Sequence, residues 1–204
     1  SYTKDGKFQF VSFSAQCFDA NATNPYTPAA YFWPSTFTKE EEEYLTNELQ
    51  RLISLLGMKT CVFNIETRVG QNNKPYIMEL TPRGGGNRLS EMIRYSTGVD
   101  LITAITRAMV GDEPGEIEQK PYNGHWAEII LHAENDGEFV GLQINPALPA
   151  EVIEEDLWVN PGDKVHGFEA ANDAIGTLVL RFENEKDLEK AITNQSSWLR
   201  VVLK

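Results

Sequence analysis

Two glutamates on neighbouring predicted strands constrain this chain of 204 residues more than any other feature of its sequence. Residues 61–68 and 75–80 alternate in the manner of strands, and the Gly-Gln-Asn-Asn-Lys between them has the composition of a turn. A hairpin centred on Asn72-Asn73 places Glu66 opposite Glu79, with both carboxylates on one face. Facing carboxylates repel each other, so a cation is expected between them. Magnesium is the natural candidate because it binds through one or two carboxylates and completes its shell with water and phosphate oxygens.

The same alternation assigns the other side chains of the hairpin to its two faces. On the first strand the core face is expected to hold Cys61, Phe63 and Ile65, and the carboxylate face Val62, Asn64 and Arg68. On the second strand Tyr76, Met78 and Leu80 are expected on one face. The other face, which carries the carboxylate, is expected to hold Ile77, Glu79 and Thr81. The simpler interpretation is that both glutamates are solvated residues, since antiparallel sheets commonly leave one face wet.

A glycine-rich corner follows the second strand. Thr81-Pro82-Arg83 leaves the sheet on the carboxylate face and places a guanidinium beside the two glutamates. Gly84, Gly85 and Gly86 are free to adopt positive φ, and consecutive backbone N–H groups in such a corner can form an anion-binding nest. The helix expected after the corner points its positive N-terminus back toward it. Together these features favour a metal and anion site over an open sheet face.

These residues resemble the ATP-grasp ligases, in particular their carboxylate-amine ligase branch. That family carries an acidic metal ligand on one strand, a second strand ending in Glu-x-Asn-Pro-Arg, a Gly-rich corner, and a helix closing near Thr-Gly-x-Asp. The matching residues here are Glu66, then Glu79 to Arg83, then Gly84 to Asn87, then Thr97 to Asp100. Thr81 stands where the family usually has Asn as a third magnesium ligand, and its hydroxyl is a weaker oxygen donor.

The resemblance implies ATP and magnesium, or manganese in its place, as cofactors. In such enzymes ATP phosphorylates a carboxylate, and an amine then displaces phosphate from the acyl phosphate to give an amide or peptide bond. Arg83 is implied to act on the transferred phosphoryl group; the alternative is that it pins the corner by pairing with a carboxylate such as Glu91. The other implied roles are metal binding by Glu66, Glu79 and Thr81, nucleotide contact by Glu66, Glu79 and Met78, and substrate binding by Gly84, Gly85, Gly86 and Asn87.

Three other interpretations stay open. A biotin-carboxylase-like enzyme uses the same metal pair, but that family has Gln and Glu shortly after the arginine, where this chain has Gly85 and Asn87. A carbamoyl-phosphate-type synthase ranks close behind. A non-catalytic binding module would keep the fold without turnover, although the intact glutamates and arginine argue against it. The chain has no Gly-x-Ser-x-Gly, Walker loop or dinucleotide fingerprint, so the nucleophile is expected to come from the substrate.

The whole sequence predicts an α+β chain: the C-terminal half of an ATP-grasp fold, with an antiparallel sheet flanked by helices, followed by a small antiparallel β-rich domain. The expected boundaries are 1–111 for the first part, 112–121 for an acidic Pro/Gly linker, and 122–204 for the small domain. Asp5-Gly6 is expected to turn a first hairpin. A capping box at Thr38 and Glu41 predicts an amphipathic helix up to Gly57.

Residues 19–35 contain several aromatic side chains but show no periodicity, so they are expected to form a long loop. The resemblance places this loop at the substrate pocket; a surface loop packed on the core is the alternative. A helix marked by Leu89, Met92 and Ile93 is expected to end at Gly98, and further helices are expected over 101–110, capped by Asp100, and over 185–192. Strands are expected over 126–132, 138–142, 176–182 and 198–203. His125, His132 and His166 lack metal-ligand spacing, so structural roles are expected for them.

Composition narrows the classes of partner. A net charge of -12 and a pI near 4.7 argue against nucleic acid or an anionic membrane, since both require basic patches. The acidic segments 40–43, 112–118 and 151–156 are expected to be solvated surface. Two cysteines without framework spacing, and no signal or membrane-length apolar run, favour reduced thiols and the cytoplasm.

The chain opens at Ser1 without an initiator methionine and moves directly into a hairpin. In ATP-grasp proteins a nucleotide-clasping half precedes the segment seen here, so we expect this chain to be the C-terminal part of a longer enzyme. The expected partners are that missing N-terminal half and small-molecule carboxylate and amine substrates, with a homodimer left open. The acid and the amine are expected to be selected largely by the missing half and the aromatic loop.

Overall fold

The computed structural model describes residues 1–115 and 117–204. Residue 116, inside the expected linker 112–121, lies outside the described residues. The chain divides into two compact units, the first formed by Ser1–Phe13 and Ser35–Asn123, the second by Ser14–Pro34 and Gly124–Lys204. Helices and antiparallel strands occur in both, which confirms the expected α+β class. No helix in the described part of the chain has the length and apolar character required to cross a bilayer.

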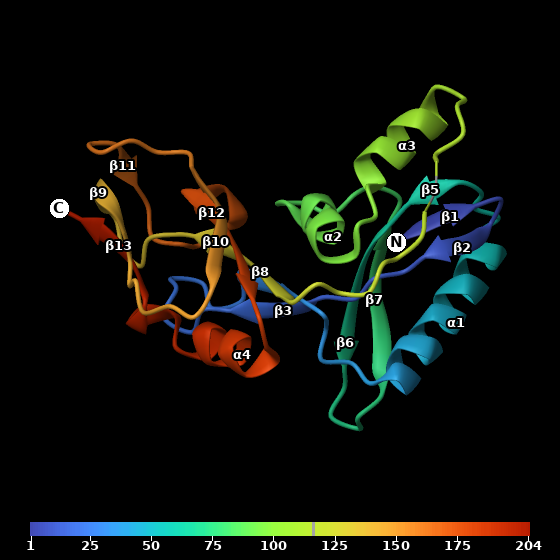
Figure 1. Cartoon of the computed structure of the whole chain (residues 1–204), viewed down its shortest axis with the longest axis horizontal. Helices are drawn as coiled ribbons and strands as arrows, with labels where there is room; N and C mark the ends of the chain where they lie inside the picture. Colours follow the sequence, from blue (N-terminus) through green and yellow to red (C-terminus); the bar gives the residue numbers. More distant parts are fainter. Residues whose placement is uncertain (116) are drawn as a thin grey trace. The chain divides into compact units, whose positions relative to one another are not determined.

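The first unit contains a three-stranded sheet, a long hairpin and three helices (Figure 1). The sheet has the order β2-β1-β5, built from β2 (Lys7–Phe10), β1 (Tyr2–Lys4) and β5 (Cys61–Val62). The hairpin pairs β6 (Asn64–Val69) with β7 (Pro75–Thr81). The helices are α1 (Lys39–Leu55), α2 (Leu89–Thr97) and α3 (Leu101–Met109). The Asp5-Gly6 turn is confirmed, with φ of 52° and 78° at its two residues, as a tight hairpin turn requires.

The helix α1 begins as its sequence predicts. The Thr38 side chain accepts the N–H of Glu41, and the Glu41 carboxylate accepts the N–H of Thr38, so the capping box is complete. Its apolar stripe is fully buried at Leu45, Leu49 and Ile53. The helix packs on β7 and β2, and so supports one strand of the carboxylate hairpin.

The segment 61–68, expected to be one strand, contributes strands to two different sheets. It breaks at Phe63, with β5 pairing to β1 before the break and β6 pairing to β7 after it. Phe63 is buried as expected, but Val62 is also buried, although the alternation assigned it to the carboxylate face. The expected alternation is therefore interrupted where the chain passes from one sheet to the other.

The second unit is built from two antiparallel sheets and a short helix. The five-stranded sheet has the order β10-β12-β8-β4-β3, and the smaller sheet the order β11-β9-β13. Their bounds are β3 (Ala15–Phe18), β4 (Pro28–Trp33), β8 (His125–Leu131), β9 (Gly137–Ile144), β10 (Glu151–Leu157), β11 (Lys164–Val165), β12 (Gly176–Phe182) and β13 (Leu199–Leu203). The helix α4 spans Glu185–Thr193 and begins at an Asn184 cap, and short 3₁₀ turns span Ala171–Asp173 and Gln195–Ser197. The core holds Ile129, Leu131, Phe139, Leu180 and Phe182.

The domain boundaries expected from the sequence require correction. Residues 14–34 were assigned to the first domain, and most of them to a loop, but they supply β3 and β4 to the sheet of the second unit. The strand β4 pairs directly with β8, with Ala30 opposite Ile129 and Trp33 opposite Trp126. The second crossing lies between Asn123 and Gly124 rather than at residue 121. Prolines obscured β4, although Pro28 occupies the first strand position, where a missing N–H is tolerated.

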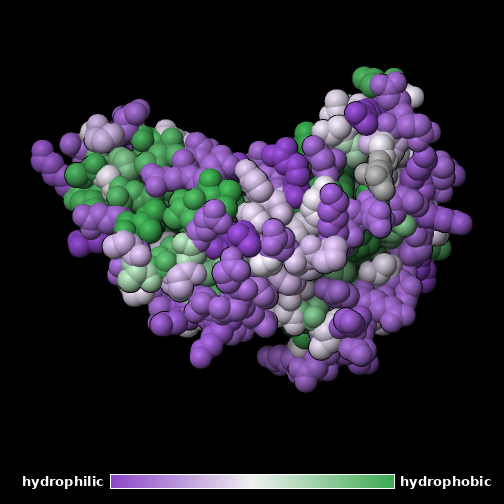
Figure 2. Space-filling view, in the orientation of Figure 1, coloured by the Kyte–Doolittle hydropathy of each residue, from purple (hydrophilic) through white to green (hydrophobic). Residues whose placement is uncertain are grey.

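The acidic segment 151–156 is also a strand rather than featureless surface. Its residues form β10, the edge of the five-stranded sheet, where charged side chains discourage pairing with other chains. Ile153 and Leu157 are half-buried along it, whereas Glu151 and Glu155 are exposed. Figure 2 shows apolar surface on this unit. Val140 of β9 and Val152 of β10 are both exposed.

Candidate metal and anion site

The hairpin of β6 and β7 brings Glu66 and Glu79 together as predicted. The two residues are direct cross-strand partners, and Asn64 and Thr81 form the next pair on the same face. Beyond Glu66 the register shifts, because Thr67 pairs with Ile77. A β-bulge therefore lies next to the carboxylate pair, a position where bulges commonly re-aim side chains at functional sites.

The bulge changes the position of Met78, which was expected to contact the nucleotide. Met78 is the extra residue of the longer strand and has no residue opposite it. Its side chain is 63% exposed, so it is available for contact, but strict alternation does not fix its direction.

Each carboxylate has one partner within the hairpin. The Arg68 guanidinium lies 2.5 Å from Oε1 of Glu66, and the Thr81 hydroxyl donates to Oε1 of Glu79 at 2.6 Å. These contacts are solvent-exposed, so each contributes only a fraction of a kcal/mol. A bound cation would therefore replace weak partners.

The sequence interpretation gave no role to Asn64. Its carboxamide shares the carboxylate face, and its Oδ1 lies 3.0 Å from where a Cβ on Gly85 would stand. Asn64 therefore lies between the glutamate pair and the glycine corner. The alternation already placed it on this face, but only the register, which pairs it with Thr81, identifies it as a fourth oxygen donor.

The glycine corner has a different geometry from the expected one. Positive φ was expected among Gly84, Gly85 and Gly86, but in the corner it falls on Asn87, with φ of 51°. Gly85 is required for close packing instead: a Cβ there would lie 2.6 Å from Cδ1 and 2.8 Å from Cβ of Leu89. The corner is thereby held against the first residue of α2.

Arg83 leaves the end of β7 with an exposed side chain. Its guanidinium donates to the carbonyl oxygen of Gly84 at 2.7 Å. The alternative partner named from the sequence, Glu91, instead receives the guanidinium of Arg88 at 2.5 Å. Arg83 is thus held beside the corner by a main-chain oxygen, with its charge not neutralised by Glu91.

The donors on this face suit magnesium. Two carboxylates, one hydroxyl and one carboxamide oxygen form two adjacent cross-strand pairs, and hard oxygen ligands are those that Mg²⁺ prefers. Across residues 1–115 and 117–204, no group of three or more His, Cys, Asp or Glu side chains is arranged to hold a metal ion. The protein can therefore supply two acidic ligands here, and phosphate and water would complete the shell, as is usual for this cation.

Comparison with known proteins gives one curated relative and many similar structures. No family model matches the sequence. A protein of Sinorhizobium fredii (strain NBRC 101917 / NGR234), described as uncharacterized protein y4rH, is 25% identical over 150 residues. The match covers 69% of this chain and 30% of that protein.

Solved structures resemble the chain over its full length. Phosphoribosylglycinamide synthetase from Anaerococcus prevotii matches with a TM-score of 0.82 at 20% identity, and L-amino acid ligase from Bacillus licheniformis with 0.78 at 17%. Each match covers 100% of this chain and 52% of the other. The biotin carboxylase domain of 2-oxoglutarate carboxylase from Hydrogenobacter thermophilus, in complex with MgADP, matches with 0.66 at 14% identity, covering 99% of this chain and 44% of that domain. The chain thus spans about half the length of the enzymes whose fold it shares.

Proposed function

We propose, from the premise that this chain has the fold of about half of an ATP-grasp ligase, that it forms the metal-binding half of an ATP-dependent carboxylate-amine ligase. In the proposed reaction a substrate carboxylate attacks the γ-phosphorus of ATP, which gives an acyl phosphate and ADP. An amine then attacks the acyl carbon, so that the C–N bond forms, phosphate leaves, and the amine gives up a proton. The nucleotide-clasping residues would come from an N-terminal half of the same enzyme.

The observation that carries the proposal is the in-register pair of Glu66 and Glu79 beside a bulge and an arginine corner. In this proposal the two carboxylates hold magnesium, with contacts from the Thr81 hydroxyl and the Asn64 carboxamide. The ion, when bound, supplies positive charge that neutralises the phosphate oxygens. Phosphoryl transfer needs little from a protein beyond positioning and charge neutralisation, and a compact oxygen set of this kind would supply the metal-binding part of both.

The remaining site residues are proposed to act on the substrate side. Arg83 can exchange its bond to the Gly84 carbonyl for the oxygens of the transferring phosphoryl group, because its guanidinium is exposed at the end of β7. The main-chain N–H groups of Gly84 to Gly86, with Asn87, are proposed to seat the substrate carboxylate. The first residue of α2 packs against Gly85, and the helix N-terminus adds partial positive charge there.

A biotin-carboxylase-like reaction is the second candidate, because domains of that class share the fold. Their TM-scores of 0.66 and 0.62 are lower than the 0.82 and 0.78 of the two ligases. Gly85 also argues against it, because its close contact with Leu89 leaves no room for a side chain at that position.

Metal binding tests the proposal directly. The chain is titrated with Mn²⁺, and binding is measured as the decrease of the electron paramagnetic resonance signal of free Mn²⁺. The titration should show one binding site. Glu66→Gln and Glu79→Gln should each weaken binding about tenfold or more, since each removes one of two acidic ligands. Asn64→Ala should weaken it by a smaller factor, because a neutral ligand is lost.

Glu40→Gln is the matched control, because Glu40 is an exposed carboxylate in the first turn of α1. It should leave the Mn²⁺ affinity unchanged. Equal affinities in the control and both hairpin variants would refute the metal site. In the complete enzyme, ADP release should require both an acid and an amine; release that requires bicarbonate instead would support the second candidate.

A further inference from the structure

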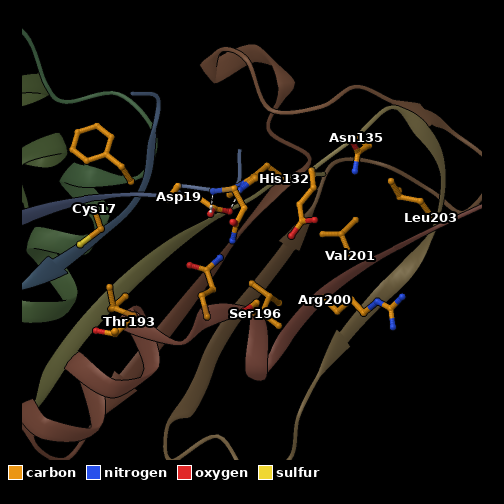
Figure 3. Close-up of a pocket in the computed structure, with 16 residues that line it drawn as sticks. Cys17, Asp19, His132, Asn135, Thr193, Ser196, Arg200, Val201 and Leu203 are labelled. Carbon is orange, nitrogen blue, oxygen red and sulfur yellow. Dashed lines mark hydrogen bonds and ion pairs between the residues drawn. The ribbon is translucent and has the colours of Figure 1, made fainter. Parts of the chain in front are cut away.

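The second unit contains a hollow of 840 Å³ that plays no part in the proposed metal site (Figure 3). Four segments of that unit form its wall: the end of β3 with the turn after it, the turn after β8, the end of α4 with the following 3₁₀ turn, and β13. The strands β3 and β13 are each at the edge of a sheet. The Trp198 indole donates to the carbonyl oxygen of Ala191 at 2.8 Å, which ties β13 to α4. A hollow of this size is within the range of small-molecule sites.

A histidine fixed on three sides lies on the wall of the hollow. The His132 ring stacks on Phe168, with centroids 4.2 Å apart and planes 18° from parallel. Its Nδ1 lies 2.7 Å from the carbonyl oxygen of Ile130, and its Nε2 lies 3.1 Å from Oδ2 of Asp19. His132 is only 8% exposed, so its ring is held firmly within the wall.

Both carboxylate oxygens of Asp19 have partners. Oδ1 accepts the backbone N–H of Asn21 at 2.8 Å, and Oδ2 lies 3.1 Å from Nε2 of His132. These contacts hold the two side chains in place on the wall. Figure 3 shows the two side chains joined at the centre of the view, with Val201, Leu203 and Arg200 to one side.

Two charged side chains on the wall lack this kind of partner. Glu134 and Arg200 both line the hollow and are exposed. Within the described part of the chain, neither side chain makes a hydrogen bond or an ion pair. One free acid and one free base therefore face the same cavity from different segments.

An apolar surface accompanies these two charges. Ile192, Val201 and Leu203 line the hollow and are only partly buried, although they also pack on the core of the unit. Such a surface favours an aliphatic group, because covering it removes apolar area from water. Neutral hydrogen-bonding groups of Asn21, Asn135 and Gln195 complete the lining.

We infer that this hollow binds a small aliphatic zwitterion, an amino acid or dipeptide with free ammonium and carboxylate groups. The ammonium pairs with Glu134, the carboxylate with Arg200, and the aliphatic part covers Ile192 and Val201. Charge-assisted hydrogen bonds at both ends select a zwitterion over a simple amine or acid. Binding at this site requires neither nucleotide nor metal, so the inference can be tested independently of the proposed ligase reaction.

The test is a titration of the chain, without ATP or divalent ions, with L-leucine and L-leucyl-L-leucine. Ring nitrogen and proton signals of His132, followed by NMR, should shift saturably, because His132 lies on the wall. Isopentylamine lacks the carboxylate and 4-methylpentanoate lacks the ammonium, so each should bind at least about tenfold more weakly.

Variants locate the two ends of the ligand. Glu134→Gln and Arg200→Gln should each lower the affinity for L-leucine about tenfold. Glu155→Gln on β10 and Lys164→Gln on β11 are charge-matched controls at exposed positions on the far edges of the two sheets, and they should change nothing. No saturable shift into the millimolar range would overturn the inference. Equal binding of isopentylamine and leucine, or equal effects in the test and control variants, would overturn it as well.

Discussion

At the scale of single residues, the role of Arg83 decides whether the glycine corner takes part in catalysis or is only structural. Its guanidinium is exposed and bound to a main-chain oxygen, so it is free to turn toward a phosphoryl group. Arg83→Lys keeps the charge but loses the planar fork. In the complete enzyme we expect turnover to fall on the order of 100-fold with little change in KM for ATP, as for an interaction made mainly in the transition state.

The same variant identifies the structural alternative. If Arg83 only ties the corner to the Gly84 carbonyl, Arg83→Lys should turn over near the normal rate and melt at a lower temperature. Steady-state kinetics and a thermal melt on one preparation distinguish the two outcomes.

Cys17 gives a residue-scale prediction about pH. Burial raises the pKa of its thiol to about 11. Since the thiolate is the reactive form, alkylation by iodoacetamide at pH 8 should be about 100-fold slower in the folded chain than in the chain unfolded by urea. The rate should rise with pH up to about 11, where the thiolate forms. Mass spectrometry of the Cys17 peptide measures the rate of alkylation. Equal rates in the folded and unfolded chains would mean that the thiol is not buried.

At the scale of elements, the connection between the corner and α2 depends on Gly85. A Cβ at this position would lie 2.6 and 2.8 Å from two atoms of Leu89, one of them the Leu89 Cβ, which cannot rotate away. Gly85→Ala should therefore destabilise the first unit by about 1–3 kcal/mol. Gly86→Ala is the control, because no atom lies within 4 Å of its added Cβ, and it should change stability by less than about 0.5 kcal/mol. Urea unfolding measures both, and equal losses would contradict the packing argument.

Elements with a complete local signal could be predicted from the sequence. The capping box predicted the start of α1, and the turn composition around Asn72-Asn73 predicted the hairpin. The register next to that turn pairs Thr67 with Ile77, so Glu66 faces Glu79 only because Met78 is bulged out. Elements decided by distant partners could not be predicted. The strand β4 pairs with β8, which is distant in sequence, and nothing within the sequence of β4 itself indicates that partner.

The candidate site shows the same division. Alternation correctly placed Glu66, Glu79 and Thr81 on one face. The bulge that leaves Met78 unopposed is a difference in strand length, which appears only when both strands are paired. Positive φ at Asn87 likewise follows from how the corner packs against α2, so glycine content alone misplaced it.

At the scale of the whole molecule, the second unit is assembled from two separate stretches of chain. A fragment of residues 124–204 lacks β4, so the edge of β8 that carries Trp126 and Ile129 is left open. We expect this fragment to aggregate or unfold without a cooperative transition, because an open apolar edge is a template for pairing. A peptide of residues 14–34 added in trans should restore a cooperative melt. Cooperative unfolding of 124–204 alone, at the temperature of the intact chain, would show that β4 is dispensable.

The last prediction concerns what the chain can bind by itself. Its candidate contacts to nucleotide are the oxygen ligands around Glu66 and Glu79, which reach phosphates through a metal ion, and the exposed side chain of Met78. In the proposed enzyme the clasping half supplies the other contacts, so isothermal titration of the 204 residues with MgATP should give a dissociation constant above about 1 mM. Mn²⁺ binding at the hairpin, measured on the same sample, shows that the site is folded. Submillimolar binding of MgATP would mean that these residues already clasp the nucleotide, and that the chain occupies a different part of the ATP-grasp fold.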